Sequence, residues 1–207
     1  MGSEVNISGG SFADGYTSEG LANISGGTFD SSFFVRASSV VNISDGTFDG
    51  VLSLDGEANI SGGNFNMLQT FLIGVVNISG GNFAPDSISE SGGNFNLFGS
   101  NFFLDGVSLD GRLTEGQAFT IEDRNVTLTS VLADGSPFSY NLPSAENPAF
   151  NPDINLTVTL VSSVPEPGSL TLIGLGSVIL LALRRKTCAG DLEVHLGFKM
   201  KPINGAR

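Results

Sequence analysis

Residues that could perform acid–base, nucleophilic or metal chemistry are scarce in this chain of 207 residues. It contains one histidine, His195, and one cysteine, Cys188. A single cysteine excludes an internal disulfide framework and a zinc site built from cysteines, and a single histidine leaves little material for histidine-based catalysis. Acidic residues are plentiful, 21 against 9 Lys and Arg, but no pair stands out by its spacing as the two carboxylates of a glycosidase. We therefore expect no enzymatic activity, no metal and no cofactor.

Three recurring patterns have both a chemical and a structural interpretation. Asp-Gly pairs could supply calcium ligands, but the calcium-binding nonapeptide Gly-Gly-x-Gly-x-Asp is absent, and Asp-Gly is the ordinary turn pair. The triplet Asn-Ile-Ser matches the N-glycosylation acceptor, and we interpret it as a packing repeat without a sugar. A row of Ser and Thr that changes to Asn along the chain could bind ice or a crystalline polymer. The Asp-Gly pairs begin at Asp14, Asp45, Asp49, Asp55, Asp105, Asp110 and Asp134.

The elements that must position these residues repeat along the first half of the chain. An eight-residue motif occurs five times, at residues 5–12, 22–29, 41–48, 58–65 and 76–83, and a degenerate sixth copy keeps only residues 91–95. The motif reads [Val/Ala]-Asn-Ile-Ser-Gly-Gly-[Ser/Thr/Asn]-Phe, with Asp45 replacing the first glycine in the third copy. Successive phenylalanines lie 17, 19, 17, 18 and 12 positions apart. This period is too short for helical repeats and suits one coil of a β-solenoid.

Each motif predicts a strand, a corner and a second strand. Alternation places Val or Ala and Ile on the inner face and Asn and Ser on the outer face, and Gly-Gly supplies the corner. Stacking coils at about 4.8 Å would align equivalent residues in ladders that bury Ile and Phe inside and join Asn amides outside. The expected ladders are Ile7, Ile24, Ile43, Ile60 and Ile78; Phe12, Phe29, Phe48, Phe65, Phe83 and Phe95; and Asn6, Asn23, Asn42, Asn59 and Asn77.

The fold class that follows is all-β: a parallel β-solenoid of about six short coils over residues 1–101 with a β-rich cap. The repeat stops near Phe102, and we expect residues 102–163 to form a non-repeating cap, because an open solenoid end is an unpaired edge. Alternating strands are predicted over residues 119–122, 125–129 and 154–160, with a hairpin at Asp134-Gly135.

The charge divides the chain into two parts. Residues 1–168 contain 19 acidic and three basic residues, a net charge of −16, whereas residues 169–207 carry +4. Such an acidic body argues against nucleic-acid binding. An apolar run over residues 169–183 is followed by the basic cluster Arg184, Arg185 and Lys186. This order predicts a single short transmembrane helix with the basic end in the cytoplasm and the body outside.

The tail over residues 164–186 resembles the PEP-CTERM sorting signal of bacterial envelope proteins. It has, in order, the motif Pro165, Glu166 and Pro167, a short apolar span and a basic cluster. The resemblance implies that exosortase, a membrane cysteine transpeptidase, recognises Pro165, Glu166 and Pro167 and cuts near them. It places the body in the cell envelope, anchored by residues 169–183 or released to the surface or matrix. The repeats and the cap also resemble exported repeat proteins of planctomycete-type bacteria, a resemblance that implies no particular activity.

Two features depart from the family pattern. Residues 1–5 lead directly into a repeat with no apolar signal-peptide segment, and residues 187–207 form an atypical extension that contains Cys188 and His195. We expect a truncated start and an abnormal end, and an incidental Cys188 rather than an acylated one. The function we expect is that of a surface or matrix protein with structural or interaction roles, sorted by exosortase. The alternatives are a polysaccharide-binding or polysaccharide-cleaving β-helix protein, with extracellular polysaccharide as partner, and a passive pseudogene fragment.

Overall fold

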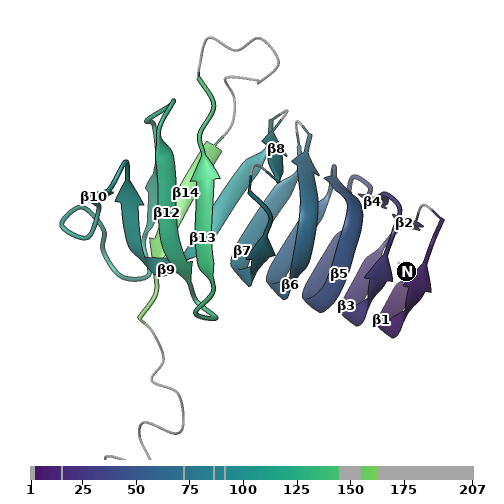
Figure 1. Ribbon diagram of the computed structural model, residues 1–207. Coiled ribbons are helices and arrows are strands. Elements are labelled where there is room, and N and C mark those ends of the chain that lie inside the picture. The colour runs from purple at the N-terminus through teal and green to yellow at the C-terminus, as the bar shows by residue number, and fades with distance from the viewer. Residues whose placement is uncertain are drawn as a thin grey trace, which may run out of the picture. The chain divides into compact units, whose positions relative to one another are not determined.

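The computed structural model describes residues 3–14, 16–71, 73–85, 87–90, 92–144 and 155–162. These residues belong to one compact unit, Met1–Ser163, and they form strands β1 to β14 with no helix among them. The prediction of an all-β parallel solenoid is therefore confirmed (Figure 1). The short C-terminal helix predicted over residues 169–183 lies outside the described residues.

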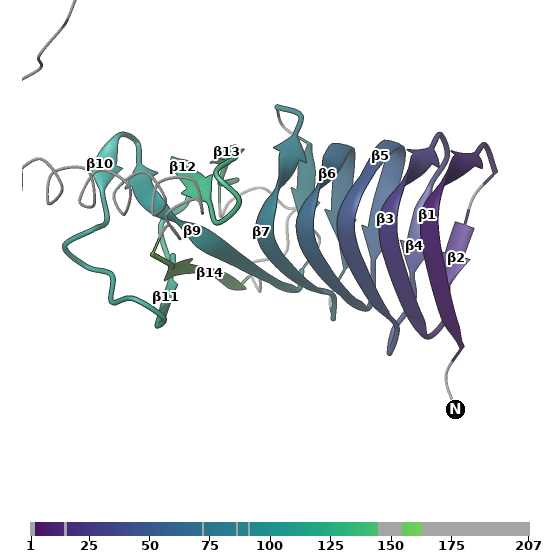
Figure 2. The ribbon, with the colours of Figure 1, turned by 90° about the horizontal axis from the view of Figure 1, so that it is seen from below.

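Five coils of the solenoid each contribute a strand to two parallel faces. Along the first face the strands pair in the order β1-β3-β5-β6-β7-β9, and Figure 2 shows them side by side. This face consists of β1 (Glu4–Phe12), β3 (Leu21–Phe29), the first parts of β5 (Val40–Leu54) and β6 (Glu57–Thr70), and β7 (Val75–Phe83). The second face consists of β2 (Tyr16–Ser18), β4 (Phe33–Val35), the last parts of β5 and β6, and β8 (Ile88–Glu90).

The register between coils places equivalent repeat residues opposite one another. Ile7 pairs with Ile24, and Ile24 with Ile43, so the inner isoleucine ladder forms as predicted. The pairing shifts at the glycine corner between β1 and β3, between β3 and β5 and between β6 and β7. The second glycine of each motif has a positive φ. At Gly27, for example, φ is 107°, and a Cβ would lie 3.2 Å from the carbonyl oxygen of Gly10. The corner therefore needs glycine for its backbone conformation and for the close approach of the neighbouring coil.

The core consists of stacked ladders rather than one irregular cluster. The four isoleucines from Ile24 to Ile78 are 1% exposed or less. Five phenylalanine rings stack nearly parallel, with centroid separations of 4.6 to 5.0 Å and interplanar angles of 7 to 14°. Stacked rings stabilise each other beyond the area they bury, and no coil can bury its own faces without its neighbours. The stacked rings are Phe12, Phe29, Phe48, Phe65 and Phe83.

The prediction that Phe95 extends this phenylalanine stack is wrong. In β9 (Asn94–Leu104), Phe95 pairs with Val76, Asn96 with Asn77, and Leu97 with Ile78. Phe95 therefore continues the inner Val/Ala row. The physical reason is that Gly92-Gly93 forms a different corner, where the backbone N–H of Asn94 donates to the carbonyl oxygen of Gly74 at 2.9 Å. The sixth copy that the backbone follows is residues 95–102, which lies 19 positions after residues 76–83.

The strands after β9 cover the last coil. The hairpin of β12 (Thr127–Leu132) and β13 (Pro137–Asn141) pairs antiparallel with the later part of β9, and β14 (Asn155–Leu160) pairs parallel with its first part. The short strands β10 (Val107–Ser108) and β11 (Ala118–Thr120) add to β9 and β14 respectively. β9 runs across the predicted boundary between residues 101 and 102, so solenoid and covering strands share one sheet.

Side chains of these strands end the ladders of the solenoid. The ring of Phe138 packs edge-on against Phe83, with centroids 5.6 Å apart and planes at 79°. At the hairpin turn, Asp134 accepts a hydrogen bond from the backbone N–H of Gly81 at 2.9 Å, and its own backbone N–H donates to the Ser79 carbonyl at 3.0 Å. Asp134 thus satisfies two backbone groups at the corner of β7, the N–H of Gly81 and the carbonyl of Ser79.

Candidate functional site

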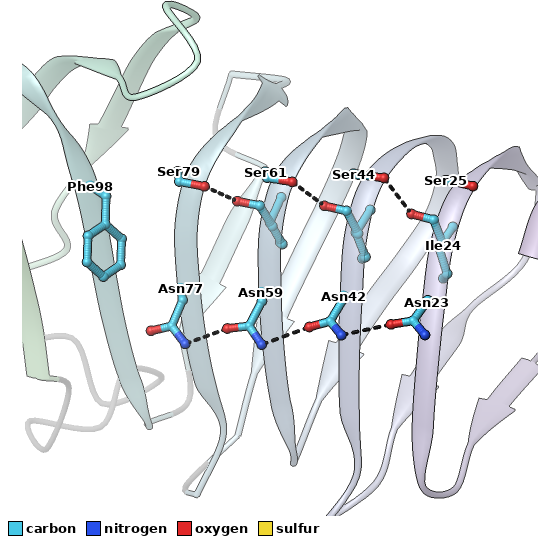
Figure 3. A pocket seen from close by; sticks show the side chains of 12 residues that line it. Asn23, Ile24, Ser25, Asn42, Ser44, Asn59, Ser61, Asn77, Ser79 and Phe98 are labelled. Carbon is cyan, nitrogen blue, oxygen red and sulfur yellow. Dashed lines mark hydrogen bonds between the residues drawn. The ribbon is translucent and has the colours of Figure 1, made fainter. Parts of the chain in front are cut away.

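A groove follows the outer surface of the first face, across the strands whose Asn and Ser side chains point away from the core. Its volume is about 690 Å³, and Figure 3 shows its two polar rows and the phenylalanine at one end. The pleat produces this arrangement because each outward Asn and Ser alternates with a buried Ile. The groove is lined by Asn23, Ile24, Ser25, Asn42, Ile43, Ser44, Asn59, Ile60, Ser61, Asn77, Ser79 and Phe98.

The asparagine row is a continuous ladder of amide hydrogen bonds, as the repeat predicts. Each Nδ2 donates to the Oδ1 of the preceding coil at 2.8 to 3.0 Å (Figure 3). The ladder includes Asn96 and ends where the Thr157 hydroxyl donates to Asn96 Oδ1 at 2.6 Å. An amide has two N–H donors and two acceptor lone pairs. Asn42 and Asn59, whose only side-chain hydrogen bonds among the described residues are those of the ladder, therefore each retain one N–H and one lone pair beyond it.

The serine row also bonds between coils. The hydroxyls of Ser44, Ser61 and Ser79 donate to isoleucine carbonyls of the preceding coil at 3.2 to 3.3 Å, which leaves their oxygens free to accept. In β9, the half-buried Phe98 takes the place of serine and lies at the end of the groove (Figure 3). Hydroxyl and amide groups thus recur once per coil and end at an aromatic ring.

The lining of the groove is electrically neutral. None of its residues carries a charge, although the chain as a whole has a net charge of −12. Two carboxylates outside the lining accept from the asparagine row, Glu4 Oε1 from Asn23 Nδ2 at 3.2 Å and Glu57 Oε1 from Asn77 Nδ2 at 3.5 Å. The groove can therefore form hydrogen bonds with a neutral polar ligand, but its side chains include no general base and no activated nucleophile.

Two of the Asp-Gly aspartates accept hydrogen bonds from backbone N–H groups. Asp45 Oδ1 accepts from the backbone N–H of Gly46 at 2.8 Å, and Asp105 Oδ1 accepts from that of Thr127 at 2.8 Å. Asp105-Gly106 forms a turn between β9 and β10, as the turn interpretation of Asp-Gly pairs predicts, whereas Asp45-Gly46 lies inside β5. Within the described ranges no three His, Cys, Asp or Glu side chains come close enough to hold a metal ion. The expectations of no metal and no catalysis remain predictions.

The residues assigned to sorting lie outside the described part of the chain. This holds for Pro165, Glu166 and Pro167, for the cluster Arg184, Arg185 and Lys186, and for Cys188 and His195. Among the described residues, no helix has the length and apolar character that crossing a membrane requires. The structure thus describes the groove, whereas the sorting segment is known from its sequence.

Sequence reasoning found the asparagine and serine rows but missed three residues that complete the groove and its ladder. These are Asn96, Phe98 and Thr157. Asn96 and Phe98 have a signal in the sequence, because residues 95–102 repeat the pattern of residues 76–83 at the 19-residue interval seen elsewhere. Thr157 has no such signal, since its contact with Asn96 joins positions 61 residues apart.

Comparison with known proteins gives one match, at the tail. Residues 163–186 match the family model of the PEP-CTERM protein-sorting motif. No curated protein and no solved structure matches the chain. The chain thus carries the PEP-CTERM sorting motif that its tail resembles, and the motif indicates an exported protein sorted by exosortase. The match carries no information on a planctomycete origin.

Proposed function

We propose that this protein is a non-catalytic component of the cell envelope or extracellular matrix, whose solenoid body acts as a structural and interaction module after exosortase has sorted it. The observation that carries the proposal is the matched sorting motif over residues 163–186 directly after a β-solenoid body. By resemblance, Pro165, Glu166 and Pro167 are the residues that exosortase recognises, and residues 169–183 hold the chain in the membrane until it is cut.

The charge distribution supports an orientation in which the basic end of the apolar span lies in the cytoplasm and the body lies outside. Basic residues that directly follow an apolar span favour the cytoplasmic side, and here Arg184, Arg185 and Lys186 follow it at once. The body, with a net charge of −16 over residues 1–168, lies on the other side. The span from residue 170 to 183 is about 21 Å long as a helix, shorter than the roughly 30 Å hydrocarbon core. Such a short span suits a temporary anchor.

Protease accessibility in whole cells tests the sorting step. The chain is expressed behind a secretory signal peptide in matched strains with and without exosortase, and its location is measured by protease accessibility in whole cells. We expect surface exposure only with exosortase, and its loss when Pro165, Glu166 and Pro167 are all replaced by Ala. The control replaces Pro148 and Pro152, two prolines outside the motif, by Ala. Identical location in both strains would refute the proposal.

The groove favours a second function, binding of an extended neutral polysaccharide. Neutral amide and hydroxyl groups recur at the spacing of the coils, about 4.8 Å, and Phe98 offers a ring at one end. A periodic, uncharged and hydroxyl-rich chain matches this lining better than a charged polymer does, because the groove provides no counter-charge. The lining includes no candidate acid–base pair, so we expect binding without cleavage.

Co-sedimentation with insoluble neutral polysaccharides tests this second function. Ser61 is exposed in the middle of the groove, and Ser61→Arg is expected to block it and reduce retention. Ser11→Arg makes the same change at an exposed serine outside the groove and serves as the matched control. Equal retention of both variants, or release of reducing ends by the unmodified protein, would contradict non-catalytic binding in the groove.

A further inference from the structure

Two copies of the N-glycosylation acceptor pattern lie outside the repeat motif. The chain holds seven Asn-x-Ser/Thr sequences without proline at x, five in the Asn-Ile-Ser triplets and two beyond them, which begin at Asn125 and Asn155. A glycan is bulky and lies at the protein surface. An acceptor asparagine must therefore be exposed, must not be engaged in other bonds, and must belong to a segment that can enter the active site of a transferase.

The triplet asparagines do not meet these requirements, because they belong to the amide ladder. The side-chain nitrogens of four of them donate to the preceding coil, and their strands β3, β5, β6 and β7 are paired on both sides. In β1, Asn6 Oδ1 accepts from Asn23. A transferase could reach the four donors only by breaking ladder bonds and pulling a strand out of the sheet. The four donors are Asn23, Asn42, Asn59 and Asn77.

The acceptor sequence at Asn155 lies within a paired strand. Asn155 is exposed, but it begins β14 and pairs with Asn94 on β9. Its threonine, Thr157, pairs with Asn96 on one side and with Thr120 on the other. The Thr157 hydroxyl also donates to Asn96 Oδ1 at 2.6 Å. Recognition of this sequence would require β14 to separate from both of its neighbours.

Asn125 combines exposure with an irregular backbone and an unengaged amide. It is exposed and lies in a bend between β11 and β12, directly after residues 121–124, which form no strand. Its φ of 56° is in the left-handed region, which asparagine tolerates better than most residues. Its backbone N–H donates to the Leu142 carbonyl at 3.1 Å, whereas its side-chain amide has no hydrogen bond to any described residue.

The threonine of this acceptor sequence is held only by contacts at the surface. Thr127 is the first residue of β12, and its hydroxyl donates to Asn141 Oδ1 at 2.9 Å in an exposed contact. Its backbone N–H donates to Asp105 Oδ1 at 2.8 Å, also in an exposed contact. Exposed hydrogen bonds exchange with water at little net cost, and the ends of elements open more easily than their centres. The segment can therefore be presented to an enzyme while the sheet remains folded.

We propose that Asn125 is an N-glycosylation site, which accepts an oligosaccharide from a lipid-pyrophosphate donor. Asn125 Nδ2 attacks C1 of the first sugar, the Nδ2–C1 bond forms, and the bond from C1 to the pyrophosphate oxygen breaks. Nδ2 gives up one proton, and the lipid pyrophosphate leaves. An oligosaccharyltransferase, the partner that this site requires, catalyses the step. The inference rests on the proposed export, since a donor on the outer side of the membrane meets only exported chains.

Transfer to the folded full chain in vitro tests the proposal. The chain, in a detergent without a sugar head group, is incubated with a purified bacterial oligosaccharyltransferase and a lipid-pyrophosphate-linked oligosaccharide of known mass. A synthetic peptide of residues 121–129 verifies that the enzyme accepts the sequence. Intact mass and peptide mapping should show one added glycan, on Asn125. An unmodified folded chain, or modification of Asn59 to the same extent, would overturn the proposal. The assay contains no exosortase, so a failure here is distinguishable from a failure of sorting.

Variants at the acceptor sequence separate modification from stability. Asn125→Asp removes the acceptor nitrogen but keeps a residue that tolerates the left-handed conformation, so the mass increase should disappear and the melting temperature should stay nearly the same. Thr127→Ser should keep the glycan, whereas Thr127→Val should lose it. Asn155→Asp makes the matched change at the other exposed acceptor and should leave the mass increase intact. A glycan that persists in Asn125→Asp, or that disappears in Asn155→Asp at an unchanged melting temperature, would show that Asn125 is not the acceptor.

Discussion

Replacing Asn59 by Ala should show how much the amide ladder stabilises the solenoid. Asn59 makes two ladder bonds, donating to Asn42 at 3.0 Å and accepting from Asn77 at 2.8 Å. A hydrogen bond contributes about 0.5–1.5 kcal/mol net, so the loss of two predicts a decrease of about 1–3 kcal/mol in the free energy of unfolding. For a unit of this size each kcal/mol lowers the melting temperature by about 2–4 °C.

Urea unfolding followed by circular dichroism measures this difference, with Asn64→Ala as the control. Asn64 is exposed and takes part in one longer bond, from Asn82 Nδ2 at 3.2 Å, so its loss should cost less than about 0.5 kcal/mol. Asn59→Asp tests the direction of the ladder, because the carboxylate can accept from Asn77 but cannot donate to Asn42. It should destabilise at least as much as Asn59→Ala. Equal stability of Asn59→Ala and Asn64→Ala would refute the reasoning, since water would then replace the ladder bonds without loss.

Three further predictions concern the core, the covering hairpin and the corner. Phe48 is 1% exposed and stacked between two rings, so Phe48→Ala should lower the free energy of unfolding by about 3–5 kcal/mol. Phe34 is 44% exposed, so the control Phe34→Ala should change it by no more than about 0.5 kcal/mol. Equal losses of the two variants in urea unfolding would contradict the stacked core. Asp134→Ala should cost about 1–2 kcal/mol, because it removes the carboxylate that accepts from Gly81 and from Ser136. It should also increase light scattering because the solenoid end opens, and unchanged scattering would argue against a covering role. Gly81→Ala, at a φ of 106°, should cost about 1–3 kcal/mol, whereas Gly9→Ala, with open space around its Cβ position, should be near neutral in the same assay.

The repeating part of the fold could be predicted because strand pleat and period determine it. Once Asn and Ile alternate at a fixed position in every coil, the inner and outer ladders follow without knowledge of other parts of the chain. The asparagine ladder is the clearest case, since its predicted members are joined in order by hydrogen bonds. The serine side of the groove follows from the same alternation.

The end of the solenoid could not be predicted in the same way, because the sequence Gly-Gly occurs in corners of two different geometries. Matching the letters of Gly92-Gly93 to the motif placed Phe95 in the wrong ladder, whereas the alternation around Asn96 gives the observed register. Beyond β9 the pairing is long-range. β14 joins β9 across about 60 residues, and the edge-on contact of Phe138 with Phe83 depends on the hairpin folding back towards β7. No local period encodes such contacts.

Mass spectrometry of the mature protein tests the central claim, that exosortase processes this chain at its tail. The protein is purified from the surface fraction of a strain with exosortase, and its C-terminal peptide is identified. The account predicts a C-terminus near Pro165, Glu166 and Pro167, so that the basic cluster beginning at Arg184 is absent. Surface protein that retains Arg184 and the residues after it would contradict the account.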